Sequence, residues 1–439
     1  MIYKPSMFNY RSNYENEMII YNSLKGLQSV SLVSEDKVWR VRKLFEEEKI
    51  EEEILQGLEE LIGLNFFVPY DFDEKLNRER RQMEYIMQPS LRVVVHTTKA
   101  CNFRCKYCAL NFEPKHLQQD GCDNIISFFR KNISKYERVH ISWFGGEPLL
   151  KMDAIEYISN AVMDICRRAK KPYYSSVTTN GYLLTPENVD KLIKLRVYNY
   201  AVTVDGVKAT HDNQRVLENG NGSFDQIIRN LEYMRDSVKS RALNVIIRTN
   251  ITREIFDRLE EYYNFYNDRF GGDNRFSLFV RPAGDWGGDR VKQFKGHLIE
   301  KGEMEEVYDK LSGLVQGIKY NLNYMDLDFA GTTCNATMLH KYVFGCDGLV
   351  SKCDTCNKEL AIEKIQSGKK VINTERENQW LMGHRSKDTE CDNCFFSGSC
   401  FMNACPKGPI LYGEKICAKY PDIDSLLRLY IKSQEVRRI

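Results

Sequence analysis

The chain has 439 residues, 28% of them charged and 42% hydrophobic, which is the balance of a soluble globular protein with two or three domains. Its net charge is only +2, so we expect no nucleic-acid partner, because proteins that bind nucleic acid usually carry a basic excess. No apolar run approaches about 20 residues and the first residues lack a signal-peptide pattern, so we expect no membrane partner and a cytoplasmic location.

Residues 1–88 are predicted to form a small N-terminal α+β domain of winged-helix-like character. The stretches "EMIIYNSL" and "QSVSLVSEDKVW" have the composition of strands. The charged run "KLFEEEKIEEEILQGLEELIGL" follows, and its apolar residues recur at roughly helical spacing, so we expect a helix there. Its acidic residues 46–53 are expected to form a solvated helix face.

Residues 89–300 repeat a strand-then-helix rhythm. Six apolar runs, from "LRVVVHTT" to "RFSLFVRPAG", alternate with segments of helical length. Such a pattern predicts an α/β core in which helices cover a parallel sheet, and active sites lie at the carboxyl ends of the strands in sheets of this kind. Residues 301–330 are predicted to form a helical linker. The cysteine-rich region 331–439 is so poor in aliphatic residues that we expect metal centres to stabilise it.

Fourteen cysteines are unusual for a cytoplasmic chain, and they are clustered. Three lie within residues 101–108 and nine within residues 334–417, while Cys122 and Cys166 stand alone. In a reducing compartment, clustered thiols are more often metal ligands than disulfides.

The stretch "KACNFRCKYCAL" places Cys101, Cys105 and Cys108 at C-x3-C-x2-C spacing. Three thiolates can hold three irons of a [4Fe–4S] cluster and leave the fourth iron open to an exogenous ligand. A structural zinc site is the alternative, but zinc requires a fourth ligand, for which His96 and His116 are the candidates. Reduced thiols without metal are a further alternative.

These motifs resemble those of the radical S-adenosylmethionine (SAM) enzymes. "CNFRCKYC" resembles the cluster loop of that family, "GGEP" at 145–148 its second motif and "TTNG" at 178–181 its third. "TVDG" at 203–206, followed by "HDNQR", resembles the fourth. The resemblance covers about residues 90–290, and it implies a partial (β/α)6 TIM-like barrel that holds a [4Fe–4S] cluster and SAM.

The resemblance also implies which residues bind SAM. The second motif would bind the methionine amino group, the third would lie near the ribose, and the fourth would lie along the cofactor. Arg215 would pair with the methionine carboxylate, for which its bidentate fork is suited, and Tyr107 would lie beside the adenine. The residues placed at SAM in this way are Tyr107, Gly145, Gly146, Glu147, Thr179, Asn180, Thr203 and Arg215.

The later cysteines resemble the SPASM extension of radical SAM enzymes, which carries two auxiliary [4Fe–4S] clusters. A G-x4-C pattern that ends at Cys353 and a quartet that begins at Cys391 carry this resemblance. The ligands so implied are Cys334, Cys353 and Cys405 for the nearer cluster, and Cys391, Cys394, Cys400 and Cys417 for the distal cluster.

Two features depart from the family pattern. Four residues rather than three separate Cys400 from Cys405, and Cys346 and Cys356 are additional. Cys346 is the preferred fourth ligand of the nearer cluster; if neither additional cysteine binds, the open iron could hold a substrate thiolate. A zinc-ribbon-like module is the alternative for the whole region. Asp354 is a candidate general base, with an ordinary surface carboxylate as the alternative.

Enzymes with this extension resemble one another in modifying peptides or proteins. The N-terminal segment is compatible with a leader-recognition domain, which captures a leader peptide as an added strand at a sheet edge. "SVSLVSEDKVWRV" is the candidate docking hairpin, and a structural cap on the barrel is the alternative for this domain.

The resemblance therefore implies a radical SAM/SPASM peptide maturase with SAM and three [4Fe–4S] clusters. It would use a 5′-deoxyadenosyl radical to install an intramolecular crosslink, either a thioether of the sactipeptide or ranthipeptide type or a carbon–carbon bond. Its partners would be a ribosomally made precursor peptide with a leader and an electron donor such as flavodoxin or ferredoxin. The alternatives are anaerobic sulfatase-type maturation to formylglycine, with Asp354 as base, and a zinc or iron–sulfur redox sensor.

Overall fold

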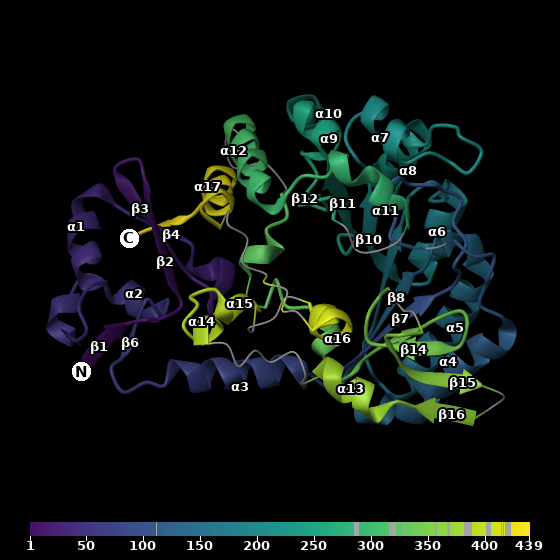
Figure 1. Cartoon of the computed structure of the whole chain (residues 1–439), viewed down its shortest axis with the longest axis horizontal. Coiled ribbons are helices and arrows are strands. Elements are labelled where there is room, and N and C mark those ends of the chain that lie inside the picture. Colours follow the sequence, from purple (N-terminus) through teal and green to yellow (C-terminus); the bar gives the residue numbers. More distant parts are fainter. Residues whose placement is uncertain are drawn as a thin grey trace.

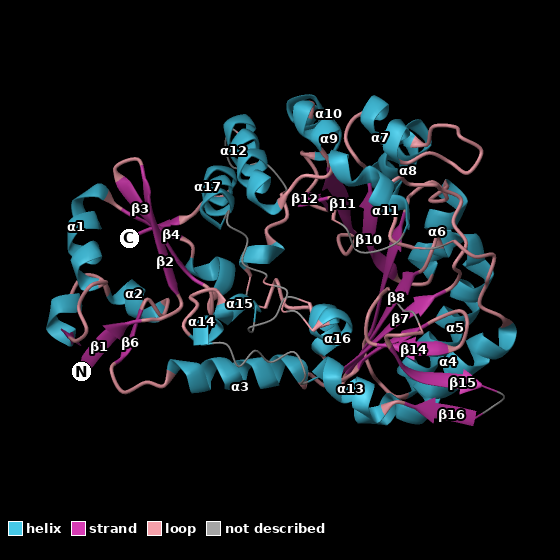
Figure 2. Ribbon diagram, in the orientation of Figure 1, coloured by secondary structure: helices cyan, strands magenta, loops and turns pink. Residues whose placement is uncertain are grey.

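The computed structural model describes residues 1–110, 112–284, 289–315, 322–328, 330–355, 358–366, 369–381, 389–400, 405–413, 415, 417 and 423–439. Its centre is a row of six parallel strands in the order β12-β11-β10-β9-β8-β7 (Figures 1 and 2). Since β7 and β12 do not pair, the barrel is partial, and the expected α/β class with a partial (β/α)6 TIM-like barrel is confirmed. These strands are β7 (Ser90–His96), β8 (Arg138–Phe144), β9 (Tyr173–Thr179), β10 (Val197–Thr203), β11 (Asn244–Ile251) and β12 (Phe276–Pro282).

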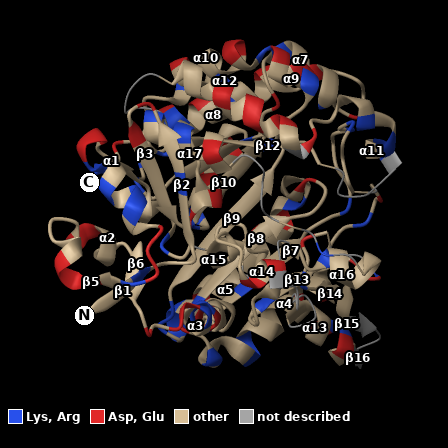
Figure 3. Ribbon diagram, turned by 60° about the vertical axis from the view of Figure 1, so that its left-hand side comes forward, with Lys and Arg blue, Asp and Glu red and all other residues tan. Residues whose placement is uncertain are grey.

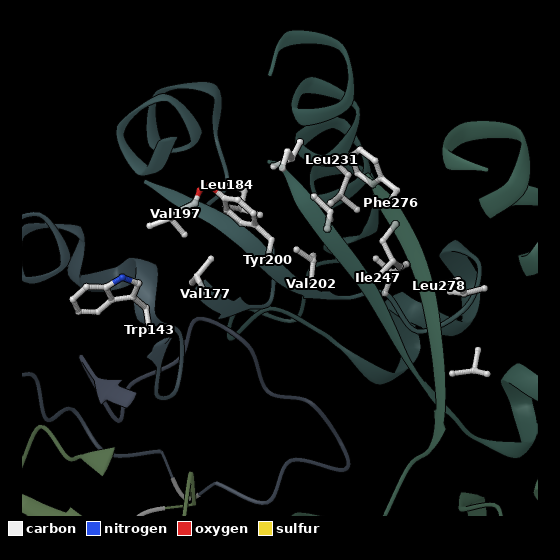
Figure 4. Close-up of a cluster of buried hydrophobic side chains, with 14 of the residues drawn as sticks. Trp143, Val177, Leu184, Val197, Tyr200, Val202, Leu231, Ile247, Phe276 and Leu278 are labelled. Atoms are coloured by element: carbon white, nitrogen blue, oxygen red, sulfur yellow. Dashed lines mark hydrogen bonds between the residues drawn. The ribbon is translucent and has the colours of Figure 1, made fainter. Parts of the chain in front are cut away.

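Helices cover the outer face of this sheet and form the main core with it. Trp143, Val177, Tyr200 and Val202 point from successive strands into this core (Figure 4). The helices are amphipathic, and the buried face of α5 recurs at helical spacing from Ile155 onward. They are α4 (Gln119–Asn132), α5 (Met152–Arg168), α6 (Pro186–Lys194), α7 (Lys208–Gln214), α8 (Phe224–Ser237), α9 (Arg253–Asp257) and α10 (Leu259–Phe270).

The cysteine-rich region extends the barrel sheet. β13 (Lys341–Phe344) pairs in parallel with β7, and the antiparallel strands β14 (Leu349–Ser351), β15 (Ala361–Gln366) and β16 (Lys369–Ile372) follow it. This sharing places the first of the later cysteines beside the barrel. α11 (Asp289–Phe294) and α12 (Met304–Leu314) precede the region, and its own helices are α13 (Thr374–Leu381), α14 (Thr389–Asp392), α15 (Ser397–Cys400), α16 (Lys407–Tyr412) and α17 (Ile423–Ser433).

The N-terminal module (residues 1–88) contains two small sheets with their own hydrophobic core. Its elements are β1 (Ile2–Pro5), β2 (Asn9–Tyr14), β3 (Glu17–Asn22), β4 (Ser31–Val33), α1 (Glu35–Leu44), β5 (Ile50–Glu51), α2 (Glu59–Gly63), β6 (Phe67–Pro69) and α3 (Glu74–Ile86). α3 leads from the module to the barrel along one side of the molecule (Figure 1).

Two expectations for this module are wrong in detail. The acidic run does not form one helix, because Ile50 pairs with Tyr3 in a sheet and Gly57 takes a positive φ of 79°. The segment proposed as a docking hairpin is instead the short strand β4 followed by α1. Leu32 and Val33 are fully buried, so this segment packs into the core of the molecule instead of extending as a free hairpin.

The last residues of the chain return to the N-terminal module. α17 packs against α12, and β17 (Arg437–Arg438) pairs in parallel with β4 (Figure 1). The final helix thus packs back onto the body of the molecule. Among the helices of the described ranges, we find none that is both long and apolar enough to cross a membrane.

Candidate active site

The loop that carries the first three cysteines follows β7 and is clamped to the segment after α7. The backbone amides of Arg104 and Lys106 donate to the carbonyl oxygens of Val216 and Gln214, at 2.8 and 3.0 Å. Phe103 is fully buried beneath the loop. The residues after the fourth motif therefore fix the loop that carries the thiols.

The three thiols are shielded from solvent. Burial raises the pKa of Cys101 to about 12 and that of Cys105 to about 11, and it also raises the pKa of Cys108. These groups are therefore neutral without metal, and binding iron would release their protons. The Phe103 amide and the Asn180 side-chain amide donate to the Cys101 sulfur, at 3.4 and 3.9 Å, an arrangement that suits a thiolate.

Zinc and an iron–sulfur cluster place different demands on the three thiols. In the part of the chain that the structure describes, no group of three or more Cys, His, Asp or Glu side chains converges closely enough for one metal ion. A [4Fe–4S] cluster spreads its ligands over separate irons, whereas zinc needs them around one centre. His116, a candidate zinc ligand, bonds through Nδ1 to Thr98 Oγ1 at 2.9 Å, and His96 is buried beside Phe144.

Gly145 and Gly146 let the end of β8 approach the cluster loop. The amide of Gly146 donates to the carbonyl of Thr98, and the amide of Glu147 donates to that of Ala100, both at 2.9 Å. Gly145 has a φ of 135°, and a Cβ on Gly146 would lie 2.0 Å from the carbonyl oxygen of Ala100. Any side chain at these positions would push the two loops apart, so the motif serves close backbone packing.

Glu147 lies behind the pocket rather than in it. Its side chain is fully buried and accepts hydrogen bonds from Thr179 Oγ1 (2.7 Å), the Asn180 amide (2.8 Å) and the Leu149 amide (3.1 Å). It is absent from the residues that line the pocket described below. In this structure its carboxyl group joins the second motif to the third and thereby positions Asn180.

Burial raises the pKa of Glu147 to about 7, against the lowering effect of the hydrogen bonds from Asn180, Thr179 and Leu149. Since the folded-state pKa is above its ordinary value, ionisation of this group opposes folding. The free energy of unfolding of the metal-free protein should therefore fall by about 3 kcal/mol between pH 5 and pH 8 from this group. Urea titrations at several pH values should show this fall in the free energy of unfolding for the wild type but not for Glu147→Gln. Parallel pH profiles of the two proteins would contradict the raised pKa of Glu147.

A buried polar network closes the bottom of the site. Asp205 accepts hydrogen bonds from the Tyr107 hydroxyl and the Asn250 amide and lies 3.7 Å from Arg215. Arg215 Nη1 donates to the Tyr107 hydroxyl at 2.7 Å, and the guanidinium lies over the ring of Phe103. The network holds Tyr107 and Arg215 beside the thiols.

These elements line one pocket of about 240 Å³ that opens at the carboxyl edge of the barrel. Of the predicted residues, the lining contains Cys101, Cys105, Tyr107, Cys108, Gly145, Gly146, Thr179, Asn180, Thr203 and Arg215.

Sequence reasoning missed two polar residues that also line the pocket. Arg248 and Asn250 lie on β11, and Arg248 stands beside Thr203 in the parallel register. The Asn250 side chain donates to the Tyr107 hydroxyl at 3.1 Å. The sequence did contain a signal for them. Arg248 and Asn250 interrupt the apolar run "ALNVIIRTNIT" at its carboxyl end, where sheets of this kind place active sites.

Three of the later cysteines lie near one another beside the barrel. Burial raises the pKa of Cys334 to about 12, and the proximity of Cys405 and Cys353 raises it further. Burial also raises the pKa of Cys405, and Cys353 adds to this effect. These residues are the three that the resemblance implies for the nearer cluster.

Cys346 is not brought to these three cysteines. It lies at the turn between β13 and β14, whereas Cys353 follows the far end of β14, so the length of that strand separates them. Its sulfur instead lies 3.6 Å from the carbonyl oxygen of Lys115. The structure therefore does not support Cys346 as the fourth ligand, and Cys356 lies outside the described residues.

Asp354, the candidate base, forms an ion pair with Lys341 at 2.5 Å. Lys341 is almost fully buried and also donates to Asn335 Oδ1 at 2.7 Å. The carboxylate is 43% exposed, so it remains accessible while Lys341 fixes its position.

The quartet residues Cys391, Cys394 and Cys400 lie on and between the short helices α14 and α15, and Cys417 is exposed. Lys415 Nζ donates to the Cys391 sulfur at 2.9 Å. The N-terminal module holds this segment from the other side: Arg78 of α3 contacts Asp392 and Ser397 at 3.1 Å each.

Comparison with known proteins agrees with this geometry. The family model described as "Radical SAM superfamily" matches residues 95–266. The chain therefore contains a radical SAM domain, and a [4Fe–4S] cluster and SAM are the cofactors of that superfamily.

Relatives of known activity share part of the chain. The AdoMet-dependent heme synthase of Nitratidesulfovibrio vulgaris is 24% identical over 225 residues, 50% of this chain and 55% of that protein. Mycofactocin maturase MftC of Mycolicibacterium smegmatis is 27% identical over 193 residues, 43% and 44% of the two chains. The cysteine-type anaerobic sulfatase-maturating enzyme of Clostridium novyi is 23% identical over 325 residues, which are 67% of this chain and 82% of that protein. The chain thus spans about half the length of the first two relatives.

Solved structures extend the similarity beyond the barrel. "Native anSMEcpe with bound AdoMet" superposes with a TM-score of 0.58 at 16% identity, over 78% of this chain and 96% of that one. The same enzyme with AdoMet and the Cp18Cys peptide gives a TM-score of 0.55 at 15% identity, with the same coverage. At these identities the likeness establishes the fold.

Proposed function

We propose that the chain is a radical SAM/SPASM peptide maturase that installs an intramolecular thioether or carbon–carbon crosslink in a ribosomally made precursor peptide. The observation that carries this proposal is the pocket at the carboxyl edge of the barrel. Three cysteine thiols from one loop face it together with polar groups from the ends of β9, β10 and β11 and with Arg215 after α7. A cluster held there by three thiolates would have an open iron at the wall of this pocket.

When bound, the cluster supplies the electron that cleaves SAM reductively. Residues of this chain would hold the cofactor in place. Arg215, anchored by Asp205, would take the methionine carboxylate, and Tyr107 would form a wall of the pocket at the adenine. Thr179, Asn180 and Thr203 supply polar groups to the same wall. The burial of the loop would exclude water from the reactive species.

Two auxiliary clusters would complete the set of three. Cys334, Cys353 and Cys405 would hold the nearer cluster, and its fourth position would stay open to a substrate thiolate or be filled by Cys356. The distal cluster would be held by Cys391, Cys394, Cys400 and Cys417. These clusters would accept the electron left after the crosslink forms. A flavodoxin or ferredoxin would supply the first electron.

Arg78 offers a test of the distal cluster. Its guanidinium is almost fully buried and bonds to Asp392 and Ser397, which flank Cys391, Cys394 and Cys400. Arg78→Met should loosen this segment and lower the iron content by about four atoms per chain, the content of one cubane. The control is Arg80→Met, an exposed residue of the same helix that pairs with Glu84. Equal iron content in both variants, measured after anaerobic reconstitution, would contradict this role.

Anaerobic sulfatase-type maturation is the second candidate. The similarity to the Clostridium novyi enzyme spans 82% of that protein, and Asp354, fixed by Lys341 next to Cys353, is available as a base. In this alternative the product would be formylglycine from a Cys or Ser residue.

Peptide mass separates the two candidates. The reconstituted enzyme would be incubated with SAM, a reductant and the small peptide encoded beside this chain. Loss of two hydrogens without a new aldehyde supports crosslinking. An unmodified peptide together with an aldehyde on a sulfatase-like peptide would overturn it in favour of the second candidate.

A further inference from the structure

Arg248 is the one charged residue of β11, and it lies in the wall of the pocket. The central strands β7 to β12 are mostly tan in Figure 3, where Lys, Arg, Asp and Glu gather on the surrounding helices. β9 and β10 contain no charged residue at all. A charged side chain on the inner face of such a sheet costs free energy unless it has a partner or a ligand.

The guanidinium group of Arg248 has no partner in the described part of the chain. Its Nε is buried without a hydrogen-bond partner, and none of the ion pairs between described residues includes this side chain. Burial lowers the pKa of Arg248, and the neighbouring cations Arg281 and Arg215 lower it further. An arginine stays protonated in proteins all the same, so the pocket wall contains an unpaired cation.

Two buried carboxylates lie near these arginines, and both already pair with another of them. Asp205 lies 3.7 Å from Arg215, and Asp326 forms an ion pair with Arg281 of β12. The described residues that line the pocket include Arg215 and Arg248 but no Asp or Glu. The anion that Arg248 lacks must therefore come from a ligand.

SAM by itself would not neutralise this cation. It brings one carboxylate, which the proposed function assigns to Arg215, together with a sulfonium and an ammonium group. Arg248 lies beside Thr203 in the parallel register of β11 and β10, so a group bound by Arg248 would lie next to the cofactor. A peptide residue that is to lose a hydrogen atom to the cofactor-derived radical has to be held at such a position.

We propose that Arg248 binds a carboxylate of the peptide substrate and thereby selects peptides with an acidic group at or next to the modified residue. This inference rests on the proposed function and names its substrate class. The planar fork of an arginine binds a carboxylate through two parallel hydrogen bonds, which fix the orientation of the bound group. An Asp or Glu side chain and the C-terminal carboxylate of the peptide are the two sources of such a group.

A double-mutant cycle between enzyme and peptide tests this assignment. The peptide found by mass analysis is prepared with each Asp and Glu changed in turn to Asn or Gln, and once with a C-terminal amide. One of these changes should lower kcat/KM for crosslinking about thirtyfold or more, the cost of leaving a buried charge unpaired. Arg248→Gln should lower it by a similar factor, and both changes together should cost little more than either alone. Losses that multiply, or no loss with any of the peptides, would overturn the proposal.

The response to SAM separates a contact with the peptide from a contact with the cofactor. Without peptide, Arg248→Gln should form 5′-deoxyadenosine at the wild-type rate, and SAM should change its electron paramagnetic resonance signal as in the wild type. Arg248→Lys keeps the charge but loses the fork, so it should recover only part of the lost kcat/KM. Arg258→Gln is the control, because Arg258 pairs with Glu261 at the surface. If Arg248→Gln loses its response to SAM, Arg248 holds the cofactor and the proposal is wrong.

If no peptide is modified, the proposed function fails, and malonate then tests Arg248 on its own. This dicarboxylate should raise the unfolding temperature of the iron-loaded wild type above that in chloride of equal ionic strength, because a ligand of the folded state stabilises it. The shift should disappear in Arg248→Gln and persist in Arg258→Gln. An equal shift in all three proteins, or no shift in the wild type, would overturn the assignment of a carboxylate to Arg248.

Discussion

Replacing Cys105 with alanine should abolish the reductive cleavage of SAM. The thiol is buried in the loop beneath the pocket, and its loss leaves two thiols for a cluster that needs three. Formation of 5′-deoxyadenosine, measured anaerobically with reductant, should fall by at least about a thousandfold, the scale of losing a catalytic unit outright.

Cys166→Ala is the matched control for this variant. Cys166 is a buried thiol on α5 that packs in the main core and is absent from the pocket lining. Its replacement should leave the yield of 5′-deoxyadenosine nearly unchanged. If Cys105→Ala retains turnover, the assignment of the three-cysteine loop to the catalytic cluster is wrong.

Asp205→Asn should destabilise the barrel by about 3–5 kcal/mol, the cost of leaving a buried charge without its partner. Asp205 is fully buried, lies 3.7 Å from Arg215, and accepts hydrogen bonds from Tyr107 and Asn250. The asparagine keeps the shape but removes the charge that balances Arg215. Urea unfolding followed by circular dichroism measures the loss.

Asp225→Asn is the control for this second variant. Asp225 pairs with Lys208 at the surface, where both side chains are more than half exposed. Exposed pairs contribute about 0–1 kcal/mol, so the midpoint should shift little. Equal midpoints for the two variants would show that Arg215 does not depend on Asp205.

The parts of the fold that follow from local pattern were predictable. Apolar strands and amphipathic helices alternate from Ser90 to Pro282, and the structure forms the six parallel strands that this rhythm predicts. Within the site, the spacing of the three thiols along one loop indicated their chemistry, and the glycine motif was identified by its resemblance to the family. Each of these signals lies within a few residues of sequence.

The parts that depend on distant segments were not predictable. Asp205, Asn250 and Tyr107 come from three elements, and only the folded sheet brings them together. Residues 437–438 pair with Ser31 and Leu32, a contact that no local periodicity encodes. The strand β14 separates Cys346 from Cys353, and this separation becomes visible only in the fold.

The orientation of the Glu147 side chain was not predictable from the sequence either. A carboxylate in a glycine motif beside a cofactor site invites a role in contacting the ligand. The structure turns it inward, where it accepts hydrogen bonds from Thr179, Asn180 and Leu149. The burial of Glu147 could not be inferred from the motif, because it depends on three hydrogen-bond donors that lie on two different loops.

The most direct test of the central claim is the electron paramagnetic resonance spectrum of the reduced, iron-loaded protein with and without SAM. SAM should change the signal of one cluster, because we propose that it binds at the open iron of a cluster held by Cys101, Cys105 and Cys108. In Cys105→Ala that SAM-sensitive signal should be missing, while the remaining signals persist. A colourless zinc protein, or an iron signal that SAM leaves unchanged, would contradict the account.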